Sequence, residues 1–209
     1  MSEASIKQAI QREYLECAQN PVHFMRKYCT IQHPKKGKIK FDLYPFQEKC
    51  LTDFKDNRYN IILKARQLGI STLSAGYALW LMLFHNDKNI LVIATGKETA
   101  KNLVTKVRVM YEGLPQWLKT GTEEINKLSL RFKNGSQIKA IASNESAGRS
   151  EALSLLILDE AAFIDKVDTI WTAAQQTLAT GGGCIALSTP NGVGNWFHKQ
   201  WVGAEDGSN

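Results

Sequence analysis

The chain has 209 residues, of which 44% are hydrophobic and 22% are charged, and this composition excludes a disordered tail, a collagen-like repeat or a mucin-like stalk. Twenty-six Lys and Arg against 20 Asp and Glu give a net charge of +6, which suits an anionic partner or simply a basic, solvated surface. The four cysteines have no CxxC spacing, so a reduced compartment is expected. The strongly apolar, uncharged stretch of residues 70–86 is shorter than the roughly 20 apolar residues of a membrane span and predicts a buried helix.

Residues 1–40 predict a helical segment followed by a basic loop, and residues 41–209 predict the main domain. Within residues 1–30, apolar side chains recur at helical spacing, and we expect this face to pack against the main domain. The stretch 33–38 combines turn formers with lysines and is expected to be exposed; it either contacts phosphates or is only solvated. The apolar residues of the helical face are Ile6, Ile10, Tyr14 and Leu15.

From residue 60 onward, short apolar runs alternate with helical segments, which is typical of a parallel sheet covered on both faces. A hairpin is predicted over 128–141, because Asn134 and Gly135 separate two short apolar runs. The other strands are expected at 61–63, 90–94, 138–141, 155–158 and 184–187, and the helices at 71–84, 97–111 and 164–179.

The first apolar run leads into a segment that has the context of a phosphate-binding loop, namely a strand, a glycine-containing turn and a helix that opens with Ser-Thr. The segment departs from the pattern GxxxxGK[ST] at two positions, because Lys64 stands where the first glycine belongs and Ile70 where the lysine belongs. A lysine at the entry of the loop can reach the same phosphate oxygens from the other side, and Arg66 offers a second cation. Ser71 keeps the hydroxyl that would hold Mg²⁺, with Thr72 beside it. Alone, this segment is equally compatible with a strand-to-helix turn that carries incidental charges.

A second motif supports the first. Four apolar residues at 155–158 end in Asp159 and Glu160, which places both acids at the carboxyl edge of a buried strand, where ligands bind in open α/β sheets. Asp159 would take Mg²⁺ through water, and Glu160 would polarise the attacking water as a general base. The two motifs together predict nucleoside triphosphate hydrolysis.

Two further segments fit this site. Ser188, Thr189, Pro190 and Asn191 close the next strand with groups that can sense a γ-phosphate, although they also form good turn chemistry. Upstream, the segment 44–47 sets Tyr44 and Phe46 beside Gln47, which suits stacking on a base and hydrogen bonding to its edge. The competing interpretation places Tyr44 and Phe46 in the core.

Taken in order, these motifs resemble the ATPase domain of the large terminase subunit of tailed bacteriophages, over about residues 43–197. The resemblance implies a P-loop fold of the additional-strand, catalytic-glutamate class, with a central, mostly parallel sheet flanked by helices, preceded by the N-terminal helical segment. It implies ATP and Mg²⁺ as cofactors, Glu160 and Lys64 as catalytic residues, Ser71 and Asp159 as metal ligands, and the segment 188–192 as the motif that couples hydrolysis to DNA movement. It also identifies 44–47 as an adenine-recognising motif. The implied ATP-binding residues are Tyr44, Gln47, Lys64, Ala65, Arg66, Gln67, Leu68, Gly69, Ile70, Ser71 and Thr72.

The resemblance gives Arg149 a role as an arginine finger inserted into the site of a neighbouring subunit, so that activity requires a homo-oligomeric ring. The other implied partners are double-stranded DNA, the portal protein and the small terminase subunit, with no membrane, in the cytoplasm of the host cell. The family's nuclease domain has no counterpart in the sequence, so we expect a C-terminally truncated fragment without nuclease activity. On the helix 97–108, Lys101, Lys106 and Arg108 either face DNA or are solvated.

Two alternatives stay open at this point. The first is a helicase-like translocase of the same P-loop class, against which the segment 188–192 and the displaced lysine argue. The second is a nucleotide-binding assembly module that no longer hydrolyses, which Ile70 in place of lysine favours and the intact Ser71, Asp159 and Glu160 oppose.

Overall fold

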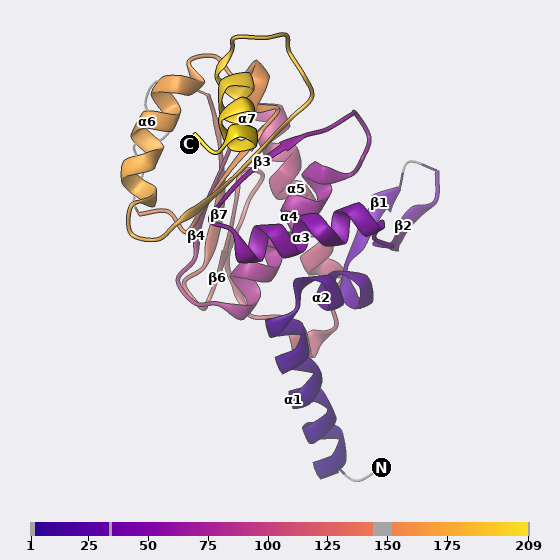
Figure 1. The fold of residues 1–209 in the computed structure, drawn as a ribbon. Coiled ribbons are helices and arrows are strands. Elements are labelled where there is room, and N and C mark those ends of the chain that lie inside the picture. The colour runs from indigo at the N-terminus through magenta and orange to yellow at the C-terminus, as the bar shows by residue number, and fades with distance from the viewer. Residues whose placement is uncertain (1–2, 34, 144–151, 209) are drawn as a thin grey trace.

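The computed structural model describes residues 3–33, 35–143 and 152–208 and shows a seven-stranded sheet between two layers of helices (Figure 1). Five neighbouring strands are parallel, and two antiparallel strands extend the sheet at one end, so the expected mostly parallel sheet is confirmed. In spatial order the strands are β3 (Tyr59–Leu63), β9 (Gly183–Ser188), β8 (Leu155–Asp159), β4 (Asn89–Ala94), β7 (Gln137–Ala142), β6 (Ser129–Phe132) and β5 (Thr122–Ile125).

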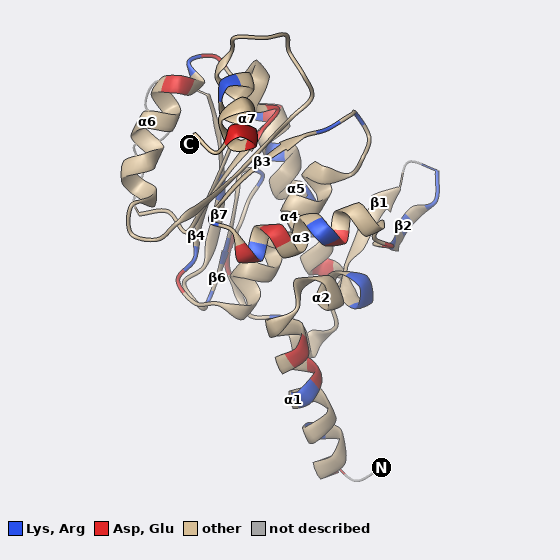
Figure 2. Cartoon of the chain, viewed as in Figure 1, with Lys and Arg blue, Asp and Glu red and all other residues tan. Residues whose placement is uncertain are grey.

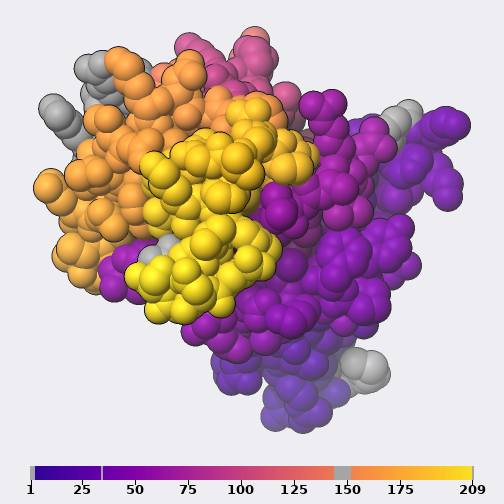
Figure 3. Space-filling model, turned by 45° about the horizontal axis from the view of Figure 1, so that its top comes forward, coloured from indigo at the N-terminus to yellow at the C-terminus, as the bar shows by residue number. Residues whose placement is uncertain are grey.

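Each face of the sheet has its own apolar core. Alternate side chains of a strand point to opposite faces, and β8 follows this rule: Leu155 and Ile157 join one core, whereas Leu156 and Leu158 join the other. The first core is covered by α3 (Pro45–Asp56), α4 (Ile70–Phe84) and α5 (Lys97–Gly113), and the second by α6 (Val167–Leu178) and α7 (Trp196–Asp206). Figure 3 shows the C-terminal helix in yellow, between the orange α6 region and the purple residues.

The apolar run at 70–86 forms the helix α4, as predicted. It is buried on nearly all sides, from Leu73 to Leu83, between the sheet and helices α3 and α5. Of the helices in the described part of the chain, none is long and apolar enough to cross a membrane. The Asn134-Gly135 hairpin between β6 and β7 is also confirmed. The strand β5, the helix α7 and the short 3₁₀ turns η1 (Gln116–Leu118) and η2 (Ala161–Phe163) were not predicted.

The N-terminal segment differs from the prediction in two ways. It forms two helices, α1 (Glu3–Gln19) and α2 (Pro21–Tyr28), because Asn20 caps the second helix with its side chain and Pro21 takes its first turn. The expected apolar face is left largely uncovered by the main domain, since α1 extends away from the body of the protein (Figure 1). The ring of Tyr14 makes an edge contact with Phe84 of α4, but all four residues of the face are exposed, namely Ile6, Ile10, Tyr14 and Leu15.

The basic stretch after α2 is the turn of a small antiparallel hairpin, β1 (Thr30–His33) and β2 (Gly37–Lys40). The His33 ring orders this turn, because Nδ1 accepts hydrogen bonds from the backbone N–H groups of Lys35 and Lys36. The hairpin displays a basic surface (Figure 2). Its exposed cations are Lys35, Lys36, Lys38 and Lys40.

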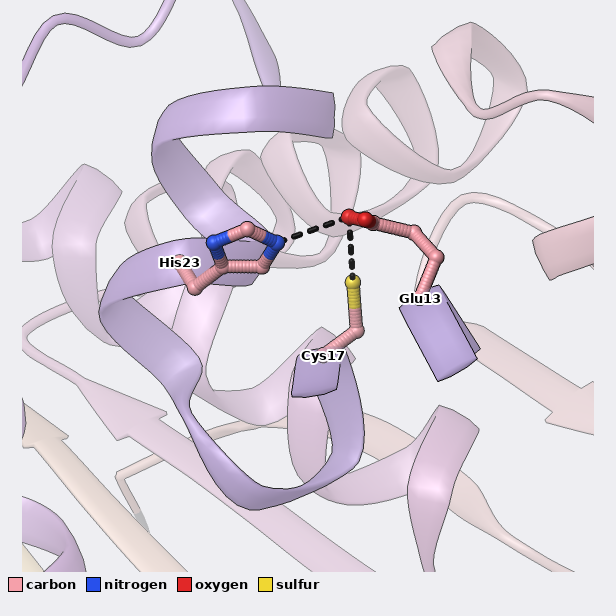
Figure 4. Close-up of side chains that lie close together, drawn as sticks. All are labelled: Glu13, Cys17 and His23. Carbon is pink, nitrogen blue, oxygen red and sulfur yellow. Dashed lines mark hydrogen bonds and ion pairs between the residues drawn. The ribbon is translucent and has the colours of Figure 1, made fainter. Parts of the chain in front are cut away.

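Polar groups hold α1 against α2 around Glu13 (Figure 4). Its carboxylate lies 2.7 Å from His23 Nε2, 2.8 Å from Lys27 Nζ and 3.8 Å from Cys17 Sγ. The hydrogen bonds from Lys27 and His23 lower the pKa of Glu13 to about 2, whereas burial, followed by the Glu13 charge, raises the pKa of Cys17 to about 12. Although the residue types are those of metal ligands, the Glu13 charge is already balanced by Lys27, so we interpret the cluster as an ion-pair clamp.

Candidate nucleotide-binding site

The register of three parallel strands brings the predicted motifs to one edge of the sheet. Leu63 of β3 pairs with Ser188 of β9, and Leu187 of β9 pairs with Asp159 of β8. The residues that follow these strands therefore lie at the same carboxyl edge. The backbone N–H of Lys64 continues the ladder and donates to the Ser188 carbonyl over 3.0 Å.

Lys64 and Glu160 are in direct contact across this edge. The Lys64 Nζ lies 2.5 Å from the Glu160 Oε1, and the lysine side chain is 7% exposed while the carboxylate is 28% exposed. Partial burial alone would raise the pKa of Glu160, but hydrogen bonds from Lys64 and Thr189 outweigh it and lower the pKa below its ordinary value. Glu160 is therefore held as a carboxylate beside a cation.

Glu160 also contacts the segment after β9. Its Oε2 accepts hydrogen bonds from the Thr189 backbone N–H at 3.0 Å and from the Thr189 hydroxyl at 3.1 Å. Its backbone has φ +56°, in the left-handed region that is uncommon for a residue with a side chain. Asn191 adds a hydrogen bond from its amide to the carbonyl of Ala162, and the Ala162 N–H donates to the Ser188 hydroxyl. The predicted coupling segment is thus bonded to the strand end that carries Glu160.

Ser71 and Asp159 form the second pair of the site. The Ser71 hydroxyl at the start of α4 donates to the Asp159 Oδ1 over 2.9 Å. Asp159 is 5% exposed, and burial raises its pKa above the ordinary value against the opposing effects of Ser71, Lys106 and Lys64. A hydroxyl and a carboxylate at this distance are the hard oxygen donors that Mg²⁺ prefers, so the donor set fits this ion.

The loop between β3 and α4 leaves most of its side chains exposed, including Arg66 and Leu68. Gly69 adopts φ +73° at the N-cap of α4, and a Cβ there would lie 2.8 Å from the Gln47 Nε2. Glycine is therefore required both by the left-handed backbone and by the close approach of Gln47. The start of α4 points its free N–H groups toward the loop, which suits an anion.

The glutamine motif, residues 44–47, is hydrogen-bonded to the loop between β3 and α4. Gln47 is 2% exposed, its amide nitrogen donates to the Leu68 carbonyl over 2.9 Å, and its oxygen accepts from the Tyr44 backbone N–H over 3.0 Å. Tyr44 and Phe46 are 64% and 42% exposed and stack in parallel, so the interpretation of both as core residues is wrong. Helix α3 begins at Pro45, so Tyr44 is its N-cap residue and Phe46 lies in its first turn.

Two of the predicted cations belong to other segments than the loop at 64–72. Arg149 lies outside the described residues. Lys106 was assigned to a DNA-facing or solvated surface, but it is half-buried and interacts electrostatically with Asp159 and Lys64. Leu103 and Met110, three residues before and four residues after Lys106 on the same side of α5, are buried.

One family model and several solved structures match the chain. A family model described as "Terminase large subunit, T4likevirus-type, N-terminal" matches residues 61–208. The chain is similar to the ATPase domain of the large terminase of Thermus phage P74-26, with a TM-score of 0.59, 24% identity, and coverage of 76% of this chain and 69% of that chain.

Two longer proteins also match. The large terminase of bacteriophage HK97 matches with a TM-score of 0.70, 18% identity, and coverage of 91% of this chain and 41% of that chain. The large terminase of a thermophilic bacteriophage, solved in complex with ADP, matches with a TM-score of 0.63, 17% identity, and coverage of 80% of this chain and 44% of that chain. At these identities the structures show a shared fold, and the chain spans less than half the length of these two proteins.

Proposed function

The chain belongs to the family of terminase large subunits, and from that premise we propose that it is an ATP-hydrolysing motor domain that drives double-stranded DNA into a procapsid. The observation that carries the proposal is the contact of Lys64 with Glu160, next to the Ser71 and Asp159 pair. These four groups supply a cation for phosphate, a base for water and two oxygen ligands for Mg²⁺ at one edge of the sheet. A site built only for structure has no need to bury Lys64 and Asp159 there.

Each side chain has a proposed role. Lys64 replaces the lysine missing at position 70 and neutralises phosphate charge, and Glu160 accepts a proton from the attacking water. Because the pKa of Glu160 is lowered, this base is ionised at neutral pH. Ser71 and Asp159 hold Mg²⁺, which supplies charge neutralisation on the phosphate oxygens when bound. The backbone of residues 64–72 receives the phosphates. Gln47 contributes to nucleotide binding indirectly, because its amide donates a hydrogen bond to the Leu68 carbonyl of this loop.

The coupling segment has a defined route to the base. Thr189 donates two hydrogen bonds to Glu160, so a change in the partners of Glu160 during hydrolysis reaches the backbone after β9 directly. When the phosphate binds Lys64, Glu160 loses its ion pair with Lys64 and keeps the hydrogen bonds from Thr189. We infer that this exchange transmits the state of the nucleotide to residues 188–191.

The remaining parts of the proposal extend beyond this site. We assign the motor domain to residues 41–209 and the helices and hairpin of residues 1–40 to an accessory segment. We propose that Arg149 completes the site of a neighbouring copy in a ring, and that the ring works with the portal protein and the small terminase subunit in the host cytoplasm. We propose ATP hydrolysis, and no nuclease reaction, as the chemistry of these 209 residues.

The first experiment measures steady-state ATP hydrolysis with Mg²⁺ as protein concentration rises, with and without double-stranded DNA. We expect Glu160→Gln to lower turnover on the order of 100-fold while ATP binding persists, because a general base contributes about that much. Glu112→Gln, which changes an exposed acid of α5, serves as the matched control.

The outcomes separate the three candidate functions. DNA-stimulated turnover that rises per subunit with concentration, and that Arg149→Ala abolishes, supports a motor completed by a neighbouring copy. ATP-dependent strand separation favours a helicase-like translocase, and tight ATP binding with no turnover at any concentration favours a binding module.

A further inference from the structure

Helix α5 carries three cations in its middle part, and one of them differs from the others. Lys101 pairs with Glu98 over 2.8 Å and Arg108 with Glu112 over 3.8 Å, both along the surface of the helix. Lys106 is half-buried, and its ammonium forms no ion pair or hydrogen bond with any residue in the described part of the chain. A cation that is withdrawn from water without a direct partner is costly to keep.

The geometry of the helix directs Lys106 toward the nucleotide site. Helix α5 follows the carboxyl end of β4 and returns along the sheet, and helical side chains slant toward the start of their own helix. The long lysine stem therefore carries its charge back toward the carboxyl edge. On the same side of α5, Leu103 and Met110, three residues before and four residues after Lys106, are buried in the core.

The surrounding charges agree with this direction. Lys106 interacts with the buried Asp159 carboxylate and with Lys64, the two side chains that flank the expected position of the phosphates. Burial lowers the pKa of Lys106, the Asp159 charge acts in the opposite direction, and Lys64 adds to the lowering. Two cations are thus set around one carboxylate at the site, one from the loop and one from α5.

We propose that Lys106 is a nucleotide-binding residue, a second cation that reaches the triphosphate from α5 and supplies charge that Ile70 does not. The inference rests on the proposed function, since it requires that this edge of the sheet binds ATP. The cost of burying Lys106 is offset by the anion when nucleotide is present. Without nucleotide, this cost lowers the stability of the protein.

The test compares three variants of the full chain in ATP binding, measured calorimetrically in EDTA so that no metal ion contributes. Lys106→Met keeps the length of the stem and removes the charge, Lys106→Arg keeps the charge, and Lys101→Met removes a solvated charge from the same helix. We expect Lys106→Met to weaken ATP binding about 10-fold or more, the size of one charged hydrogen bond to an anion. Lys106→Arg should retain most of the affinity, and Lys101→Met should bind as the wild type does.

The melting temperature without nucleotide separates binding from structure. If Lys106 serves the ligand, Lys106→Met melts at the same temperature as the wild type or higher, and its KM for ATP rises more than its kcat falls. Unchanged ATP binding by Lys106→Met overturns the inference, and so does a loss of affinity accompanied by a lower melting temperature. If the wild type itself fails to bind ATP, the proposed function is contradicted and this inference fails with it.

Discussion

Replacement of Lys64 by methionine is expected to lower both stability and turnover, because the same ammonium serves the empty and the loaded site. In the empty site the change removes the 2.5 Å contact with Glu160. Breaking a fully buried pair costs about 3–5 kcal/mol, and breaking a surface pair costs about 0–1 kcal/mol. Here the carboxylate is 28% exposed and keeps both bonds from Thr189, so we expect a loss of about 1–2 kcal/mol. For a chain of this size, that lowers the melting temperature by roughly 3–6 °C.

In the nucleotide-bound site, the same substitution is expected to lower the turnover. Removing one preorganised donor from a charged transition state costs about 100- to 1,000-fold in turnover, and we expect Lys64→Met to lie in that range. The assays are urea unfolding without nucleotide and steady-state ATP hydrolysis, with Lys127→Met, an exposed lysine outside the site, as the control. If Lys64→Met unfolds and turns over as the control does, the contact with Glu160 has no function and the reasoning is refuted.

Three further predictions test the supports of the site and the N-terminal clamp. Gly69→Ala is expected to cost about 1–2 kcal/mol in urea unfolding and to weaken ATP binding, since its φ is +73° and the new Cβ meets Gln47; an unchanged midpoint would show that the loop relaxes. Gln47→Leu leaves the Leu68 carbonyl without its partner and should cost about 1–3 kcal/mol by the same assay, whereas wild-type stability would contradict the bond. Because the pKa of Glu13 is lowered to about 2 in the folded protein, its contribution to stability is complete above its ordinary pKa of 4.5 and is lost as the pH falls from 4.5 to 2. The melting temperature of Glu13→Gln should therefore fall less steeply over that range, and parallel curves would count against the clamp.

Most of the sheet could be predicted because its strands are continuous apolar runs. The run 155–158 is apolar at every position, and each of its residues is buried because the two faces of the sheet carry separate cores. The loop at 64–72 and the acids at 159 and 160 could be predicted for the same local reason, since their position after a strand fixes them at the carboxyl edge. The strand β5 escaped prediction because only one of its four residues is apolar.

Patterns of exposure were predicted less well where they depend on distant segments. The periodic apolar residues of α1 indicate a helix, but nothing in their spacing shows whether a surface covers them, and in the structure they are exposed. Tyr44 and Phe46 were compatible with the core by composition alone. In the structure both lie at the start of α3 and are exposed.

The sequence by itself determined the residue types of the site and the edge of the sheet that holds them, because both depend on short segments and on strand direction. Only the tertiary structure decided which side chains meet. Lys64 and Glu160 are separated by 96 positions, and Lys106 belongs to a helix that the motifs do not include. Contacts of this kind depend on strand register and on the reach of a side chain between packed elements, and neither is encoded within one local segment.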